Sequence, residues 1–113
     1  MDEQDGICGD PADIILAMTS GIEARCLGPH ACLLIAIIGV KGERSPDGFV
    51  VYTASNDRLM AMCGFSSRKT LEAAAMRASR LDWLTWEKTG QPGVHRFRLG
   101  VPARLRPEVG DDQ

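Results

Sequence analysis

The sequence predicts a small α+β domain in which short helices come first and a two-stranded antiparallel hairpin comes last. Three observations support this fold class. Between Ser55 and Leu81, serine and glycine residues mark helix ends and apolar residues recur at helical spacing. After Asp82 the spacing changes to period two, which is typical of strands with one buried face. The two period-two runs are separated by Thr89–Gly93, a loop composition that suits a hairpin.

The length and composition indicate one domain. A chain of 113 residues is long enough for one hydrophobic core and short for two. Hydrophobic residues at 44% and charged residues at 25% are ordinary globular values. The longest apolar run, Ala31–Ile38, is far shorter than the ~20 residues that cross a bilayer. The acidic N-terminus is unlike a secretory leader, so we expect a cytoplasmic protein without a membrane segment.

Charge is distributed unevenly along the chain, although the net charge is only −2. Residues 1–28 carry a net charge of −5, residues 29–106 carry +6 and residues 107–113 carry −3. A basic middle between acidic ends fits a nucleic-acid-binding core with solvated arms. The alternative is that the acidic ends only keep the protein soluble.

The N-terminal part is expected to be helical after a short arm. Residues 1–9 are polar and acidic and are predicted to be disordered. Asp10-Pro11 then favours a helix start, with an aspartate cap and proline at the first helical position. A second helix is expected to begin between residues 22 and 29, and Gly28-Pro29 is either its start or an interruption within it.

Ala31–Ile38 is apolar on every side of a helix, and such a helix must be covered on every side. Two kinds of cover are predicted: residues 10–20 docking onto this helix, or a second copy of the chain in a homodimer. Glycines at positions 39 and 42 and the turn signal Pro46-Asp47-Gly48 predict a loop after it. The β-forming residues Phe49–Tyr52 predict a short strand.

A pair of helices is expected next. Ser55 is predicted to cap a helix over Asn56–Cys63, and Gly64 suits the left-handed residue that ends it. Either Ser66 or Ser67 caps the following helix. The apolar stripe of that helix is Leu71, Ala74, Ala75, Ala78 and Leu81. Its opposite face carries Lys69, Glu72, Ala73, Met76 and Arg80.

The hairpin is predicted from two short alternating runs. Leu84 and Trp86 alternate with polar residues in the first run, and Phe97 and Leu99 do so in the second. From Val101 onward, two prolines indicate that the chain leaves the domain. The predicted organisation is a disordered acidic arm over residues 1–9, one domain over residues 10–100 and a flexible acidic tail over residues 101–113.

A resemblance to a known family rests on three strings of residues. They are Ser55-Asn-Asp-Arg-Leu-Met-Ala-Met-Cys-Gly-Phe-Ser66, then Arg68-Lys-Thr-Leu71, then Leu81-Asp-Trp-Leu-Thr-Trp86. In this order they resemble the winged helix-turn-helix family, in which similar strings occur in bacterial repressors and plasmid replication initiators. The resemblance covers residues 29–99. It implies a three-helix core with a two- to three-stranded wing, here with an additional N-terminal helix. Asp82 stands where many members have glycine, a mild departure because aspartate tolerates the left-handed conformation.

The resemblance also implies sequence-specific binding of double-stranded DNA, by a transcriptional regulator or a replication-initiator-like module of a bacterium, plasmid or phage. The second helix of a helix-turn-helix enters the major groove with its N-terminal residues at the base edges. The implied contacts on this helix are Ser66, Ser67, Arg68, Lys69 and Ala73. Those on the wing are Lys88, Arg96 and Arg98. Arg68 is the candidate for a bidentate contact to guanine, and the serines suit phosphate contacts.

A winged helix that serves only as a protein-interaction module is the alternative, because fold does not fix function. The overall acidity and the all-apolar helix favour it. The position of the basic side chains distinguishes the two readings. If they share one face, DNA binding is favoured, and if they scatter among acids, protein binding is favoured.

The sequence predicts no enzymatic activity and no cofactor. It contains no Gly-rich phosphate loop, no nucleophile elbow and no His-Glu-x-x-His motif. Its four cysteines form no Cys-x-x-Cys pair and are expected to be buried free thiols. Cys26, His30 and Cys32 are close in sequence but give one ligand fewer than structural zinc normally takes, so no metal site is predicted.

Overall fold

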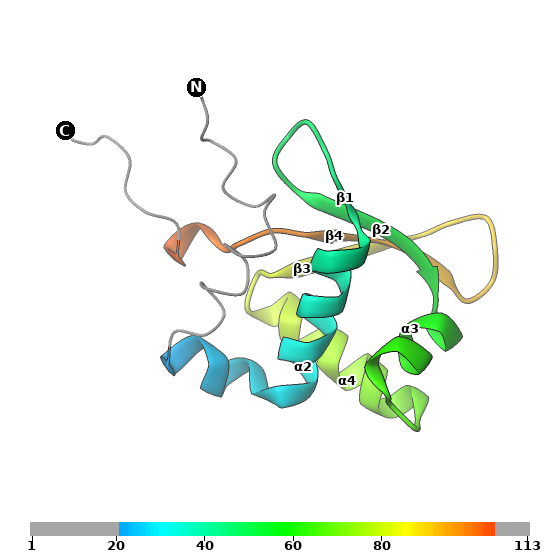
Figure 1. Ribbon diagram of the computed structural model, residues 1–113, viewed down its shortest axis with the longest axis horizontal. Coiled ribbons are helices and arrows are strands. Elements are labelled where there is room, and N and C mark those ends of the chain that lie inside the picture. The colour runs from blue at the N-terminus through cyan, green and yellow to red at the C-terminus, as the bar shows by residue number, and fades with distance from the viewer. Residues whose placement is uncertain (1–20, 106–113) are drawn as a thin grey trace.

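The computed structural model describes residues 21–105. In this range the chain forms three α-helices, four strands and a 3-10 turn. They are, in order, α2 (Gly21–Lys41), β1 (Glu43–Arg44), β2 (Val50–Ser55), α3 (Asn56–Cys63), α4 (Arg68–Arg80), β3 (Leu84–Lys88), β4 (Val94–Leu99) and η1 (Ala103–Leu105). The strands form one antiparallel sheet in the order β1-β2-β4-β3, and the helices pack on one of its faces (Figure 1). The predicted α+β class is confirmed.

Helix α2 is interrupted at Gly28-Pro29. Gly28 has φ 79° and ψ 164°, a conformation that is essentially restricted to glycine, and Pro29 has no N–H to continue the helix ladder. Next to the break, Nη1 of Arg77 donates a 3.0 Å hydrogen bond to the Cys26 carbonyl oxygen. Of the two alternatives for this pair, the structure therefore shows an interruption.

The second half of α2 is the central helix of the core. Leu34, Ile35 and Ile38 are fully buried, and α2 packs mainly against α4. By length and composition alone, α2 could cross a membrane. Of its apolar residues, Leu34, Ile35 and Ile38 lie in the core of the described domain, whereas Leu33 and Val40 are exposed.

Strand β1 lies where the sequence predicts only a loop. Glu43 and Arg44 pair with Val51 and Val50, and the turn between the strands contains Pro46-Asp47-Gly48. Gly42 precedes β1 at a tight crossing. A Cβ there would lie 2.5 Å from Cγ1 of Val50, so glycine lets α2 end directly against β2. Two charged residues carry no alternation signal, which is why this strand was not predicted.

The predicted helix ends are confirmed. The Ser55 hydroxyl accepts the Arg58 N–H at 3.1 Å at the start of α3, and Gly64 ends this helix with φ 74°. Of the two candidate serines, Ser67 caps α4, because its hydroxyl accepts the Thr70 N–H at 3.2 Å. The α4 residues of the predicted apolar stripe are buried, namely Leu71, Ala74, Ala75 and Ala78, whereas Leu81 is half-buried.

The hairpin forms as predicted, but the sheet is larger. Leu84 in β3 lies opposite Leu99 in β4, and Leu99 also lies opposite Val50 in β2. Strand β4 is therefore central and the sheet has four strands, one more than the upper number expected. Asp82, in the turn before β3, has φ 69°, the left-handed conformation expected at this position.

The chain does not leave the domain at residue 101. Val101 and Pro102 are buried, and Arg104 of η1 reaches the carboxylate of Glu23 in α2 at 2.6 Å. The same oxygen of Glu23, Oε2, accepts Nε1–H of Trp83 at 2.6 Å. This buried cluster joins the first and last described elements, so the expected domain end at residue 100 moves to at least residue 105. The predicted arm over residues 1–9, the helix over residues 10–20 and the rest of the acidic tail lie outside the described residues.

Candidate nucleic-acid interface

Helix α4 presents three of the eight predicted DNA-contacting residues to solvent, namely Arg68, Lys69 and Ala73. Its 13 residues span about 20 Å. The exposed residues of α4 are Arg68, Lys69, Glu72, Ala73, Met76, Arg77 and Arg80, which include four cations and one acid. The charged residues lie on this side because the buried stripe of α4 is apolar.

The cations on α4 differ in their ion pairs and hydrogen bonds. Nε of Arg68 lies 3.4 Å from Oε2 of Glu72 in an exposed pair. Arg77 is held at the break in α2 by the Cys26 carbonyl. Lys69 and Arg80 form no ion pair with the part of the chain that the structure describes. Exposed pairs such as Arg68–Glu72 contribute little to stability, so Arg68 can exchange its partner at small cost.

The start of α4 is open to solvent. Ser66 and Ser67 are exposed, and the Ser67 hydroxyl is already used as the helix cap. Backbone N–H groups at a helix start favour an anion. Ala73 lies further along the helix and borders a shallow hollow next to Pro29 of α2, so it marks the edge of the exposed face rather than its middle.

A cavity of about 360 Å³ lies between α4 and the β3–β4 hairpin. Its apolar lining is Leu71, Ala75, Met76, Trp86 and Phe97. Arg68, Glu72, Asn56 and His95 supply its polar groups. Sequence reasoning did not find this cavity. The available signal was Met76, an apolar residue on the charged face of α4, which is 46% exposed.

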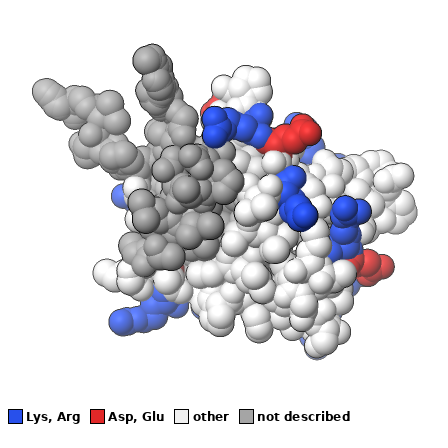
Figure 2. Space-filling view, viewed as in Figure 1, with Lys and Arg blue, Asp and Glu red and all other residues white. Residues whose placement is uncertain are grey.

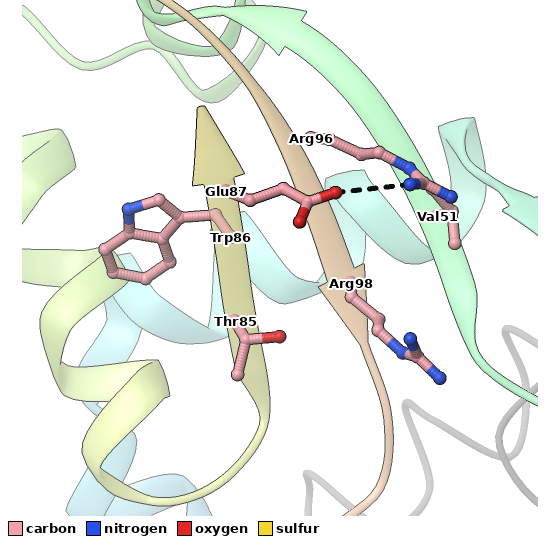
Figure 3. A pocket seen from close by; sticks show the side chains of 6 residues that line it. All are labelled: Val51, Thr85, Trp86, Glu87, Arg96 and Arg98. Carbon is pink, nitrogen blue, oxygen red and sulfur yellow. Dashed lines mark hydrogen bonds and ion pairs between the residues drawn. The ribbon is translucent and has the colours of Figure 1, made fainter. Parts of the chain in front are cut away.

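Arg96 and Arg98 lie on the opposite face of the sheet from α4. In β4 they alternate with Phe97 and Leu99, which point into the core. Figure 3 shows Arg96 beside Glu87, with Nη1 of Arg96 3.2 Å from Oε2 of Glu87, while Trp86 points to the other side of the sheet. Lys88 lies two residues after Trp86 and is therefore expected on the side of α4.

Arg98 is engaged on this outer face as well. It forms an ion pair with Asp47, and its guanidinium lies 4.3 Å from the centre of the Phe49 ring. The Ser45 hydroxyl donates to the same carboxylate and, together with the positive charge of Arg98, lowers the pKa of Asp47.

The predicted basic residues therefore do not share one face: those of α4 with Lys88 lie on the helix side, and Arg96 and Arg98 lie on the outer face. Arg68, Arg96 and Arg98 each lie beside an acid. By the criterion taken from the sequence, this distribution counts against DNA binding through all of these residues and leaves only the α4 side as a candidate DNA contact.

All the thiols were expected to be buried, but of the three described only Cys63 is. Cys63 is buried, and this burial raises the pKa of its thiol to about 11. Cys26 is exposed and Cys32 is half-buried. The His30 ring packs edge-on against Phe65, with ring centres 5.1 Å apart. Within residues 21–105 no three histidine, cysteine or acidic side chains are grouped so that they could hold a metal ion.

Comparison of the chain with protein-family models, with curated proteins and with solved structures finds no match.

Proposed function

We propose that this chain is a winged helix-turn-helix domain that binds double-stranded DNA through α4, as a transcriptional regulator or a replication-initiator-like module. The exposed face of α4 carries the proposal: four cations and one acid on a helix about 20 Å long, with its capped N-terminus open. A helix of this length fits the major groove, where base edges are accessible.

The order of elements supports the winged-helix assignment. A helix, two strands, two helices and a hairpin follow one another, and the central strand β4 joins the hairpin to β2. The hairpin loop and α3 lie at one end of the molecule (Figure 1), and the Asn56 N–H donates a 2.9 Å hydrogen bond to the Gly93 carbonyl there. The loop is thereby fixed to the helix pair, as a wing must be in order to contact the same DNA.

The proposed contact surface is narrower than the sequence implied. It comprises Arg68, Lys69 and Lys88, with Ser66 and the backbone at the start of α4. Arg96 and Arg98 face away from this surface and are held by Glu87 and Asp47. We therefore assign them a small role in DNA binding.

Replacing Arg68 and Lys69 together with alanine is expected to weaken DNA binding. Losing two phosphate contacts lowers the salt slope, d log K/d log[salt], by about 2 in magnitude. If Arg68 reads a base, discrimination falls by about 1–3 kcal/mol at one position. Both side chains are exposed, so stability should change by no more than about 0.5 kcal/mol. The measurement is a titration of target and scrambled duplexes, the target being selected from a random DNA pool, at several salt concentrations.

The matched control is the Arg96→Ala/Arg98→Ala variant, which removes the same charge from the outer face of the sheet. It should retain most of the affinity and the salt slope. If the control loses affinity and the α4 variant does not, the contact surface has been assigned to the wrong face. If neither variant differs from the wild type, the protein-interaction function becomes the better proposal.

Protein–protein interaction is the second candidate function, and the outer side of α2 favours it. Leu33 is 40% exposed and Val40 is 61% exposed, seven residues apart and so on one side of the helix. In the view of Figure 2, an area without charged side chains lies below the blue side chains at the centre. The homodimer through Ala31–Ile38 stays a prediction, and the alternative cover by residues 10–20 lies outside the described residues.

The Leu33→Glu/Val40→Glu variant tests the homodimer. If a second copy covers this side of α2, the wild type should have the mass of a dimer in light scattering and the variant the mass of a folded monomer. The control is Arg25→Glu, which also adds negative charge to an exposed position of α2 outside the apolar stretch. A wild-type chain that is monomeric at every accessible concentration would contradict the prediction.

A further inference from the structure

The cavity between α4 and the hairpin has the size and walls of a small-molecule site. Its volume of about 360 Å³ lies within the range of ligand pockets, about 300–1,000 Å³. Leu71, Ala75 and Phe97 form a buried apolar wall, with exposed fractions of 3%, 7% and 3%. Ala75 is one of three successive alanines, and its small side chain leaves the space that a longer one would fill.

Aromatic and sulfur-containing side chains complete the apolar part. The ring centres of Trp86 and Phe97 lie 6.1 Å apart at 46°, an arrangement that offers ring faces and edges to a flat guest. Met76 is 46% exposed and Trp86 is half-buried. A planar apolar ligand would remove this surface from water, which is favourable because apolar surface is poorly hydrated.

The polar groups favour a carboxylate on that ligand. Nε of Arg68 lies 3.4 Å from Oε2 of Glu72, and the terminal nitrogens of Arg68 form no hydrogen bond with the residues that the structure describes. Those nitrogens form the planar fork that binds a carboxylate in a bidentate manner. The other titratable group lining the cavity is His95, and Lys88 lies directly opposite His95 in the β3–β4 ladder. With Arg68 and Lys88 against Glu72, the excess charge is positive and favours an anion over a cation.

We propose that this cavity is a binding site for a small planar aromatic carboxylate, with its ring between α4 and the hairpin and its carboxylate on Arg68. The site does not depend on DNA binding. Competition between the ligand and DNA for Arg68 would follow, and that consequence alone rests on the proposed function.

The two tryptophans provide an internal control for testing the site. Trp86 lines the cavity, whereas Nε1–H of Trp83 is held by Glu23 in the buried cluster elsewhere. Titration of the ¹⁵N-labelled full-length chain with 2-naphthoate should shift the indole N–H signal of Trp86 and leave that of Trp83 in place. The Trp86→Phe variant assigns the two signals. If neither signal moves at millimolar naphthoate, or if both move together, the proposal is overturned.

The neutral analogue 2-naphthamide tests the carboxylate contact. It should bind at least about tenfold more weakly than 2-naphthoate, the factor expected for one charge-assisted hydrogen-bonded contact. Arg68→Gln should reduce naphthoate binding to the level of the amide, and Arg80→Gln, an exposed cation on the same helix outside the cavity, should not. Equal binding of acid and amide by the wild type would overturn the ligand class.

A filled cavity tests the location of the ring. Ala75→Leu should abolish the binding of both naphthalene compounds, provided that its circular dichroism spectrum is that of the wild type. Unchanged naphthoate binding by the folded variant would overturn the site. If Ala75→Leu does not fold, Met76→Glu, at an exposed position of the lining, replaces it with the same expectation.

Discussion

Replacing Trp83 with alanine is expected to lower the free energy of unfolding by about 3–5 kcal/mol. Trp83 is 1% exposed and is the largest fully buried side chain of the described domain. Its removal leaves a cavity and also deprives the buried Glu23 carboxylate of its 2.6 Å indole donor. Urea denaturation followed by circular dichroism measures the change. Fluorescence is less suitable, because the wild type has two tryptophans and the variant has only Trp86.

The Trp83→Phe variant separates the two contributions. It keeps an aromatic ring in the core and removes the N–H donor, while Arg104 still donates to the same oxygen of Glu23. It should therefore cost about 1.5–3 kcal/mol, the net contribution of one hydrogen bond to a charged group. If the Trp83→Ala variant is as stable as the Trp83→Phe variant, the core relaxes around the missing ring and the predicted cavity cost is wrong.

Replacing Arg104 with methionine is expected to lower the free energy of unfolding by about 1.5–3 kcal/mol, the net contribution of a hydrogen bond to a charged group. The loss is smaller than for a fully buried ion pair, because the Arg104 side chain is 43% exposed and Trp83 still donates to the Glu23 carboxylate. The substitution also removes the 3.0 Å hydrogen bond from Arg104 to the Leu81 carbonyl. Chemical denaturation of the purified variant measures the loss.

A second substitution, Glu23→Gln, should restore about 1–2 kcal/mol in the Arg104→Met background, because a neutral amide is cheaper to bury than an unpaired carboxylate. Arg80→Met is the control, since Arg80 is exposed and has no ion-pair partner among residues 21–105. It should change stability by less than about 0.5 kcal/mol. If Glu23→Gln gives no recovery, the Arg104 effect does not arise from the stranded carboxylate.

Local signals predicted much of the fold because each is complete within a few residues. A serine before each helix, a glycine after α3 and an apolar stripe in α4 predicted where these helices lie, apart from the choice between Ser66 and Ser67. Period-two alternation placed β3 and β4 in the same way. These features depend on neighbours three or four residues away, and the sequence contains them directly.

The features that were not predicted depend on distant residues. In the sequence, Glu23 is one of several acids in an acidic N-terminal region. Its contacts with Trp83 and Arg104 arise only in the folded chain, so its burial was not predicted. The tail was predicted to leave at Val101 because prolines end regular structure, yet a chain without regular structure can still pack, as Pro102 does. Strand β1 consists of two charged residues and is defined by its pairing with β2. Such a short charged segment carries no sequence pattern that predicts a strand.

The separation of the basic residues could have been recognised from the sequence. Phe97 and Leu99 were expected to point into the core, and alternation then places Arg96 and Arg98 on the other face of the sheet. In a domain with one layer of helices, that face lies away from α4 (Figure 1). The cavity was beyond sequence reasoning, because it depends on how closely Ala75 and Trp86 approach across two elements.

The position of Glu23 has a consequence for synthesis of the chain. Its carboxylate is buried in the finished domain, but Arg104 follows it by 81 positions. At about 5–20 residues per second, this interval is on the order of ten seconds. Trp83 follows Glu23 by 60 positions and Arg104 only by 81, so the first half of α2 lacks its full set of partners until the end of that time. The beginning of the domain is therefore completed only when its last described residues have left the ribosome.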